Sequence, residues 1–420
     1  KMKRKMMLTD NWDESTELDK LAELSIKTGV ALQQGQDLLI TAPLEAAPLV
    51  RRLTFHAYQQ GCGIVTPLYT DPEVTLLRYK NASKESFDKS TDWLFDAMGV
   101  AFDQNTARLA VVGEDPMLLS GQNADDIGRA NQAVSKASSP VRERITRFNV
   151  NWNIIAWPGT QWAKRVFPNL EEAEAQEQLA RAIFQASRLD GKDPIENWNI
   201  HNKNLRTKTD WLNAKNFASL HFYGDGTDLK VGLADGHEWM GGASKARNGV
   251  VCNPNIPSEE VFTTPHALKV NGYVKSTKPL SHQGILIENI FVVFENGKIT
   301  EAKASKGEEV FLKLIDTDEG ARRLGEVALV PHSSPISQSN LLFYNTLFDE
   351  NAACHIALGQ CYSKCFKNGD TLSKDEIAKN GGNSSMIHVD WMIGSDAINI
   401  DGLDQDGKVT PVFRAGEWAL

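Results

Sequence analysis

Two residues that could bind a metal ion stand two positions apart in the run SSMIHVDWMIG, in the last third of the chain. The apolar and β-branched neighbours of His388 and Asp390 predict a buried strand. Residues two apart on a strand face the same way, so the imidazole and the carboxylate would converge while Val389 and Trp391 pack behind them. Such a pair is costly inside a core unless a charged species lies between the two groups. A metal ion is the obvious species.

Further metal donors lie in other segments that are predicted to be buried. The stretch NAACHIALGQCY predicts a helix with Asp349 as its N-cap, which places His355 and Tyr362 seven residues apart on one face. Two carboxylates complete the set, Glu326 in RRLGEVALV and Glu260 in IPSEEVFTTP. A lone histidine on an apolar face is more often an ordinary core residue, so the prediction rests on the joint pattern.

The charges of this set balance around two divalent cations. The carboxylates of Glu260, Glu326 and Asp390, together with one bridging hydroxide, would neutralise two such ions. The only basic partners nearby in sequence are Arg322 and Arg323. Mixed oxygen and nitrogen donors suit zinc, cobalt or manganese, whereas magnesium and calcium prefer oxygen alone. The residues therefore predict a centre for two divalent metal ions, with zinc as the first choice.

A family resemblance is carried by four long segments, NIPSEEVFTTP, TDEGARRLGEVALVP, FYNTLFDENAACHIALG and IHVDWMIG. They resemble the aminopeptidase S and aminopeptidase T family of dinuclear metalloaminopeptidases, and WAKRVFP, DGKDPIENW and GTDLKVGLA are similar to it as well. The ligand set that the resemblance implies is Glu260, Glu326, His355, Tyr362, His388 and Asp390. Of the neighbouring Glu259 and Glu260, it selects the second. It also implies a homodimer and peptide substrates with a free N-terminus.

The reaction that the resemblance implies is hydrolysis of a peptide bond at a free N-terminus by a hydroxide held between two metals. Metal binding lowers the pKa of water from 15.7 to about 7, which makes hydroxide available at neutral pH. Glu326 follows Gly325, which permits close backbone approach, and Glu326 is expected to bridge the metals. Tyr362 is either a ligand or an oxyanion donor. Glu259 is the candidate proton shuttle, because strand alternation would turn it away from Glu260.

Two other classes of function remain as alternatives. One is a different dinuclear metallohydrolase, such as an amidase, an esterase or a phosphoesterase. The chain lacks the clustered Arg and Lys that a phosphoesterase would need to bind phosphate. The other is a non-catalytic binding protein on the same fold, whose signature would be the loss of ligands. All six positions hold competent residues, which favours the aminopeptidase.

Composition predicts a globular enzyme of the cytoplasm. The 420 residues are 41% hydrophobic and 24% charged, and the net charge of −9 argues against a nucleic-acid partner. No apolar stretch reaches the roughly 20 residues that span a bilayer, which argues against a membrane. The N-terminal run KMKRKMM lacks an apolar core, so we expect a frayed tip or an expression remnant rather than a signal peptide or anchor. Five cysteines predict free thiols in a reducing compartment.

One cysteine pair, Cys361 and Cys365, would share a face if its segment were helical. A structural zinc site usually needs four such ligands, and no second pair of this spacing exists. We therefore expect buried or half-buried thiols rather than a cysteine metal site.

The chain divides near residue 190 into an N-terminal α/β domain, residues 1–190, and a mixed α+β catalytic domain, residues 191–420. Between Leu18 and Arg188, the apolar runs DLLITAP, CGIVTPLY, ARLAVVGED and NWNIIAWPG alternate with helical stretches. This alternation predicts βαβ units and a mainly parallel sheet. No Gly-x-Gly-x-x-Gly and no P-loop follows these strands, so a domain for support and substrate access is preferred to a nucleotide site.

The second half begins with a predicted helix from Pro194 to about Asn213 and continues as strands and tight turns. Hairpin turns are expected around residues 224–226 and at Asn296 and Gly297, a pair that readily adopts positive φ. The run DGLDQDGKV lacks the terminal Glu of a calcium loop, so it predicts a turn at residues 406–407.

Overall fold

The computed structural model describes residues 17–224, 226–282 and 284–420, so the N-terminal run KMKRKMM lies outside the described residues. The contacts form two compact units. The first extends to Ile200 and takes back Ala243–Pro257, and the second consists of the remaining residues. The predicted domain boundary near residue 190 lies shortly before this division and stays a prediction.

The segment Ala243–Pro257 belongs to the first unit because it extends that unit's backbone pairing. Ile154 N donates to the carbonyl of Pro254 at 2.7 Å, and Asn153 Nδ2 donates to the carbonyl of Asn253 at 2.7 Å. The segment also contains a short ribbon of β7 (Ser244–Lys245) and β8 (Val251–Cys252).

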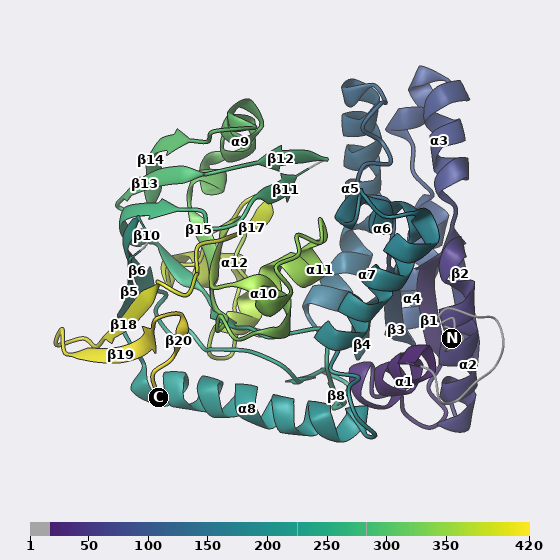
Figure 1. Ribbon diagram of the computed structural model, residues 1–420, viewed down its shortest axis with the longest axis horizontal. Helices are drawn as coiled ribbons and strands as arrows, with labels where there is room; N and C mark the ends of the chain where they lie inside the picture. Colours follow the sequence, from purple (N-terminus) through teal and green to yellow (C-terminus); the bar gives the residue numbers. More distant parts are fainter. Residues whose placement is uncertain (1–16, 225, 283) are drawn as a thin grey trace. The chain divides into compact units, whose positions relative to one another are not determined.

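A four-stranded parallel sheet of order β2-β1-β3-β4 is the centre of the first unit (Figure 1). Its strands are β1 (Leu38–Pro43), β2 (Val65–Thr70), β3 (Ala107–Val112) and β4 (Trp152–Ala156). Each strand falls in one of the four predicted apolar runs, and every neighbouring pair is parallel. The predicted βαβ organisation is confirmed.

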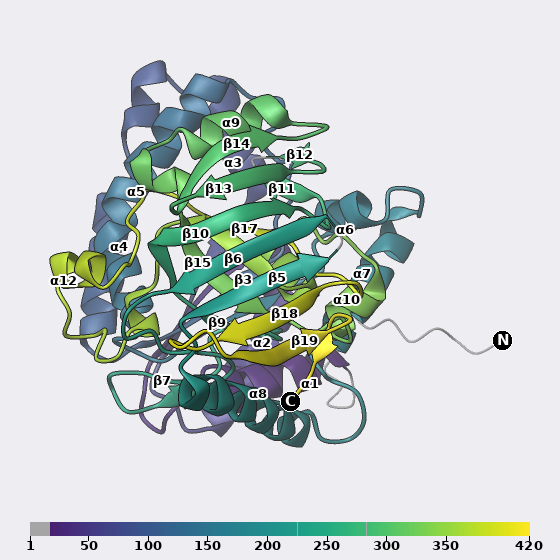
Figure 2. The ribbon, with the colours of Figure 1, turned by 90° about the vertical axis from the view of Figure 1, so that its left-hand side faces the viewer.

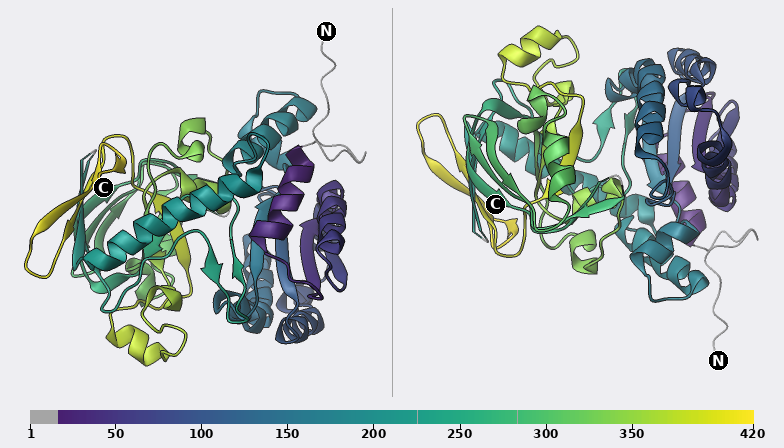
Figure 3. Two further views of the ribbon diagram at one scale, coloured as in Figure 1. Left: turned by 90° about the horizontal axis from the view of Figure 1, so that it is seen from below. Right: turned by 90° about the horizontal axis from the view of Figure 1, so that it is seen from above.

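Helices lie on both sides of this sheet (Figure 3). The helices of the first unit are α1 (Glu17–Leu24), α2 (Ala47–Gln59), α3 (Pro72–Asn81), α4 (Asp92–Asp103), α5 (Ala124–Thr146), α6 (Thr160–Val166) and α7 (Glu172–Ala186), with short turns η1 (Ser25–Gly29), η2 (Leu44–Ala46) and η3 (Lys84–Asp88). The strand order reverses direction at β1, and right-handed crossovers then place the connecting helices on opposite faces. In agreement, α1 packs on α2 and α4 packs on α5.

An eight-stranded sheet of order β14-β13-β10-β6-β5-β18-β19-β20 forms one layer of the second unit (Figure 2). Its strands are β5 (Ser219–Gly224), β6 (Thr227–Leu233), β10 (Pro265–Lys275), β13 (Phe291–Glu295), β14 (Lys298–Lys303), β18 (Asn399–Leu403), β19 (Val409–Arg414) and β20 (Glu417–Trp418). The neighbouring strands are antiparallel. The predicted change from a parallel sheet to a mixed domain is thus confirmed.

The predicted helix and hairpins of this half are also found. The helix α8 is Pro194–Lys215, and hairpins join β5 to β6, β13 to β14 and β18 to β19. Asn296 and Gly297 both have positive φ, as the turn requires, and so does Gly407. Asp225, inside the first of these turns, lies outside the described residues.

A second layer, the four-stranded sheet β17-β16-β15-β9, carries the predicted metal donors. Its strands are β9 (Val261–Thr263), β15 (Leu324–Leu329), β16 (His355–Gly359) and β17 (His388–Met392). The other elements of the unit are β11 (Leu280–His282), β12 (Ile285–Ile287), α9 (Glu308–Ile315), η4 (Glu319–Arg322), α10 (Pro335–Ser339), α11 (Thr346–Asp349), η5 (Glu350–Ala352), η6 (Ser363–Cys365) and α12 (Lys374–Lys379).

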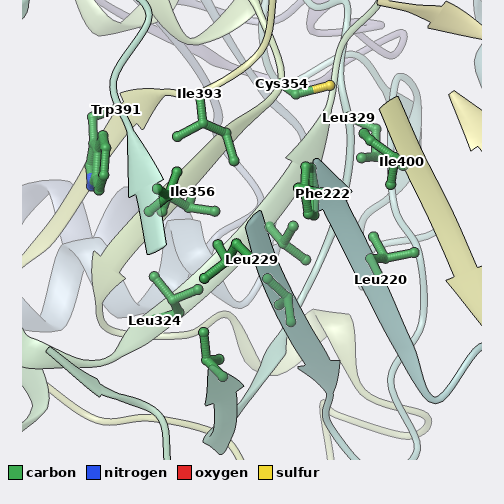
Figure 4. Close-up of a cluster of buried hydrophobic side chains, with 14 of the residues drawn as sticks. Leu220, Phe222, Leu229, Leu324, Leu329, Cys354, Ile356, Trp391, Ile393 and Ile400 are labelled. Atoms are coloured by element: carbon green, nitrogen blue, oxygen red, sulfur yellow. The ribbon is translucent and has the colours of Figure 1, made fainter. Parts of the chain in front are cut away.

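The core of the second unit lies between the two sheets (Figure 4). Leu220 and Phe222 of β5 and Leu229 of β6 meet Ile356 of β16 and Trp391 of β17. Because side chains alternate along a strand, the residues between these apolar ones face away from the core. His355 and Asp390 therefore lie on the opposite face of their sheet, with Trp391 packed behind, as the sequence predicts for β17.

The prediction of a helix from residue 351 onward is wrong, because the segment forms a strand. His355–Gly359 is the buried strand β16, which lies between β15 and β17 and is covered on both faces, so its sequence shows no polar alternation. Asp349 is not the N-cap of such a helix, because it ends α11 and its carboxylate accepts from the backbone N–H groups of Phe343 and Asn345. Cys361 likewise precedes the short η6, so it shares no helix face with Cys365.

All five cysteines are free thiols, as the sequence predicts. Among the described residues, no helix combines the length and the apolar character needed to cross a membrane.

A bulge at Gly325 directs Glu326 out of the core. The register between β15 and β16 shifts between Leu324 and Glu326, so Leu324 and Val327 both pack in the core while Glu326 faces the other side. A Cβ on Gly325 would lie 2.3 Å from the carbonyl oxygen of Gln360 and 2.4 Å from that of Gly359. Only glycine fits there.

Replacing Gly325 by Ala should therefore destabilise the second unit by about 1–3 kcal/mol or more, because backbone atoms must move to accept the methyl group. The midpoint of urea unfolding measures the loss. Gly128→Ala in α5 is the matched control, since nothing lies within 4 Å of its added methyl group, and we expect a gain of up to about 1 kcal/mol there. Equal midpoints for Gly325→Ala and the wild type would contradict the role of the bulge.

Candidate metal centre

Three adjacent strands bring four of the predicted donors onto one face. Glu326 of β15 and Asp390 of β17 both pair with Ala357 of the strand between them. His355 precedes Ala357 by two residues and His388 precedes Asp390 by two, so all four side chains share that face. The small side chain of Ala357 leaves the space between them open.

The side-chain atoms converge in two groups that share Glu326. His355 Nε2 lies 3.1 Å from Glu260 Oε2 and 3.5 Å from Glu326 Oε1. His388 Nε2 lies 3.6 Å from Glu326 Oε2 and 3.4 Å from Asp390 Oδ1. Glu326 thus presents one oxygen to each imidazole, which is the arrangement expected of a carboxylate that bridges two ions.

These distances fit a shared cation better than hydrogen bonds. Glu260 Oε2, His355 Nε2 and Asp390 Oδ1 are buried and have no hydrogen-bond partner of acceptable alignment. Two ligands of one tetrahedral zinc ion, each at about 2.0–2.1 Å, are separated by about 3.3 Å. Buried polar atoms normally have hydrogen-bond partners. Buried donor atoms that lack them, at the spacing of two ligands of one ion, therefore indicate a metal-binding site.

Backbone carbonyls set the tautomer of both imidazoles. His355 Nδ1 donates to the carbonyl of Ala353 at 3.1 Å, and His388 Nδ1 donates to that of Gln360 at 2.7 Å. A carbonyl can only accept, so in each ring Nδ1 carries a proton, and Nε2 is the nitrogen that would offer a lone pair to a metal ion. This outer contact also fixes the ring orientation, as is common for metal-binding histidines.

Burial and mutual charge shift the pKa values of the donors in the direction that favours a cation. Burial, and then the charges of Glu260 and Asp390, raise the pKa of Glu326 to about 7. Burial alone would lower the pKa of His388, but Asp390 and Glu326 raise it to about 10. In the protein alone, protons therefore neutralise the surplus negative charge, and a metal ion would displace them.

Tyr362 follows β16 and joins the same centre from a loop. Its hydroxyl lies 3.3 Å from His388 Nε2, and the two rings are 4.7 Å apart between centroids. Because His388 Nδ1 donates to a carbonyl, the phenol oxygen faces Nε2, the ring nitrogen that is left to bind a metal ion. The helical face that was predicted to bring Tyr362 near His355 does not exist, yet the loop brings the hydroxyl to His388 instead.

Glu259 faces away from the centre. Its Oε1 lies 3.8 Å from Nε2 of His201, a residue of α8, and its N–H donates to Asn351 Oδ1 at 2.6 Å. The contacts of Glu259 therefore join it to supporting residues, whereas Glu260, the next residue, reaches the donors. The two arginines near the donors in sequence also lie elsewhere, since Arg322 pairs with Asp316 and Arg323 donates to backbone carbonyls.

Sequence reasoning missed one carboxylate, that of Glu350 in η5. Burial, and then the charges of Glu260 and Asp390, raise the pKa of Glu350 well above its usual range. In sequence it is the second member of an acidic pair at a helix end, which is usually solvated. Its proximity comes from the packing of η5 against β17, and no local pattern marks it.

Comparison with known proteins places this centre in a family. The sequence matches the family described as thermophilic metalloprotease (M29) over residues 14–418. The chain belongs to the M29 family. It is 49% identical to aminopeptidase T of Thermus thermophilus over 403 residues, covering 96% of this chain and 98% of that protein. It is 45% identical to aminopeptidase 2 of Geobacillus stearothermophilus over 411 residues, covering 98% and 99%.

The fold of this M29 chain agrees with a solved relative. The structure titled wild-type AmpT from Thermus thermophilus has a TM-score of 0.92 and 48% sequence identity, covering 97% of this chain and 100% of that one. The family resemblance predicted from the sequence is confirmed, and with it the fold class. The family's use of metal agrees with the donors that converge on β15, β16 and β17.

Tyr362→Phe tests whether the phenol oxygen is a ligand. Since its distance to His388 Nε2 equals that of two ligands on one ion, we expect metal affinity to fall by about 10- to 100-fold or more. Metal titration of the purified variant, with elemental analysis, measures this. Tyr273→Phe is the control, because Tyr273 is 43% exposed, close to the 38% of Tyr362, and lies on β10. Unchanged metal affinity with a lower kcat would instead identify an oxyanion donor.

Proposed function

We propose that the chain releases N-terminal amino acids from peptides at a centre for two divalent metal ions, with zinc as first choice and cobalt or manganese as alternatives. The observation that carries this proposal is the division of the Glu326 carboxylate between His355 and His388. When bound, two such ions supply hydroxide at neutral pH and polarise the scissile carbonyl. Membership of the M29 family makes the chain a metalloaminopeptidase.

The donors divide into two sets around the proposed bridge. Glu260 and His355 would hold one ion with Glu326, and His388, Asp390 and Tyr362 would hold the other. Both sets come from the second compact unit, which supports assigning catalysis to the C-terminal part of the chain. The acyl-transfer chemistry then depends on how this chain orients the peptide and moves a proton to the leaving amine.

The contacts argue for a division of labour among the predicted catalytic residues. Glu326 and Tyr362 face the centre and can exchange a proton with a group bound there. Glu259, the predicted proton shuttle, contacts His201, and we propose that it orients Glu260 instead. The link through Asn351 supports this role, because it ties the backbone of Glu259 to η5.

We also propose a cytoplasmic location, from the composition of the sequence, and a homodimer, from the family resemblance. The five free thiols support a reducing compartment. Peptides with a free N-terminus are the proposed substrates, and neither a nucleic acid nor a membrane is a proposed partner.

Removal of metal should abolish the activity. After exhaustive chelation, hydrolysis of a peptide with a free N-terminus should fall to background, and zinc, cobalt or manganese should restore it, whereas magnesium and calcium should not. Release of the N-terminal amino acid is followed by chromatography, and circular dichroism checks that the chelated protein stays folded. Undiminished turnover by protein that elemental analysis finds free of metal would refute the metallopeptidase mechanism.

Blocking the N-terminus should abolish cleavage of an otherwise good peptide. Acetylation removes the positive charge of the amine and adds bulk where an aminopeptidase must bind it. Paired free and acetylated peptides of one sequence are incubated with the metal-loaded enzyme, and products are identified by mass spectrometry. Equal rates on the two peptides, or internal cleavage of both, would rule out the aminopeptidase assignment and indicate an endopeptidase or another metallohydrolase.

A further inference from the structure

Glu260 is held in place differently from most of the other proposed donors. Four donors lie within paired strands, namely Glu326, His355, His388 and Asp390. Glu260 comes immediately before β9, whose pairing with β15 begins at Val261. Beyond that point, Phe262 and Met240 exchange two backbone hydrogen bonds of 2.9 Å. Backbone pairing therefore fixes the chain after Glu260, and other contacts must fix the chain before it.

Two side chains bind the peptide group that precedes Glu260. The carbonyl of Ser258 accepts from His201 Nε2 at 2.7 Å, and the N–H of Glu259 donates to Asn351 Oδ1 at 2.6 Å. This carbonyl and this N–H belong to one peptide group, which is planar. Holding both of its polar ends fixes that plane, and hence the direction in which the chain enters Glu260. We call His201 and Asn351 the peptide clamp.

His201 supplies a directed hydrogen bond to the peptide clamp. It lies on α8 and is only 7% exposed. A carbonyl can only accept, so His201 Nε2 carries the proton that points at Ser258. Glu259 Oε1 lies 3.8 Å from the same nitrogen, which is beyond hydrogen-bond distance. The bond to the backbone, rather than an ion pair with Glu259, is thus the contact by which His201 places the segment.

Asn351 is itself fixed by further hydrogen bonds. Its Nδ2 donates to the carbonyl of Leu347 at 3.0 Å, and its own carbonyl accepts from Ser334 Oγ at 2.7 Å. Asn351 and Ser334 are both buried. A buried side chain that several hydrogen bonds hold has little freedom to move, so Asn351 offers the N–H of Glu259 a rigid acceptor.

The side chain of Glu260 depends on this support of its backbone. Its Oε2 lies 3.1 Å from His355 Nε2, and among the described residues it has no hydrogen-bond partner of acceptable alignment. The distance between a metal ion and each ligand must match within about 0.2 Å. A rotation of the peptide group between Ser258 and Glu259 would move the Cα of Glu260 and carry its carboxylate away from His355. The peptide clamp therefore controls a donor on one side of the proposed centre.

We propose that His201 is a positioning residue that acts through Glu260 and sets the affinity of the ion that Glu260 and His355 would hold. The ion on the side of His388 and Asp390 should not depend on it, because strand pairing fixes both of those donors. This inference rests on the proposed function and deepens it, because it names a residue of α8 that controls one of the two ions. His201 acts on the backbone and is not itself a proposed donor.

Zinc binding by a matched pair of variants tests the proposal without relying on turnover. His201→Gln keeps an N–H donor near the position of Nε2, whereas His201→Met has a similar length and no donor. Each protein is dialysed against a series of buffered free zinc concentrations, and elemental analysis measures the zinc bound per chain. His201→Met should weaken one of the two binding steps by about 10- to 100-fold, the usual effect of losing an outer contact to a metal ligand. The other step should be unchanged, and His201→Gln should recover most of the loss.

A double-mutant cycle shows whether His201 acts through Glu260. Glu260→Gln removes the donor itself and should weaken the same step. The double variant with His201→Met should lose no more affinity than Glu260→Gln alone, because the residue that His201 positions is already absent. His221→Met is the matched control, since His221 lies on β5 and its Nε2 contacts Asp228 at 2.7 Å. It should leave both steps unchanged.

The outcomes distinguish this inference from the proposed function. Circular dichroism checks that each variant is folded, and if His201→Met is not, His201→Asn replaces it, because its shorter amide does not reach the carbonyl of Ser258. Equal weakening of both steps, additive losses in the double variant, or unchanged zinc binding by the folded variant would each overturn the inference alone. A wild type that binds no zinc, cobalt or manganese would overturn the proposed function, and the inference with it.

Discussion

The burial of like charges on one sheet face is the constraint on which the rest of the second unit depends. Glu326 and Asp390 are held on either side of Ala357, and Glu260 adds a third carboxylate beside His355. Moving each such ion out of water costs several kcal/mol unless a partner compensates it. Two imidazoles cannot do so alone without binding protons. The sheet therefore has a built-in affinity for cations, and its geometry decides how many it can hold.

Strand register sets the distances between the donor side chains. A shift of one residue in β16 or β17 would turn His355 or Asp390 into the core and bring Ile356 or Trp391 to the donor face. The apolar core between the sheets prevents that shift, because those same residues are buried there. The bulge at Gly325 is the one departure from regular pairing among the described residues of this four-stranded sheet, and it lets Leu324 stay in the core while Glu326 leaves it. Stability and function thus depend on one register.

The metal donors on strands are held more firmly in position than the polar residues on loops. Strand residues are fixed by backbone pairing on both sides, which suits ligands whose spacing must match a metal ion. Tyr362 and Glu350 come from the segments that follow β16 and precede it, where the chain can approach the centre from outside the sheet. The segment before β16 also borders a pocket, which suits contacts with the substrate. The loop that Asp349 closes forms part of the same border.

Local sequence determined the elements whose signals are short-range. The apolar runs of β1 to β4, the turn at Asn296 and Gly297, and the alternation in β17 were all predictable, because each depends on neighbours in the chain. The six donor types and the family could also be recognised, since the segments around them are long. The central strand β16 was misread as a helix, because a strand buried on both faces shows no alternation. Only tertiary structure brought Tyr362 to His388, Glu259 to His201 and Glu350 to the pocket. Those contacts join residues far apart in sequence or placed by loops, and their distances follow from packing of the whole unit.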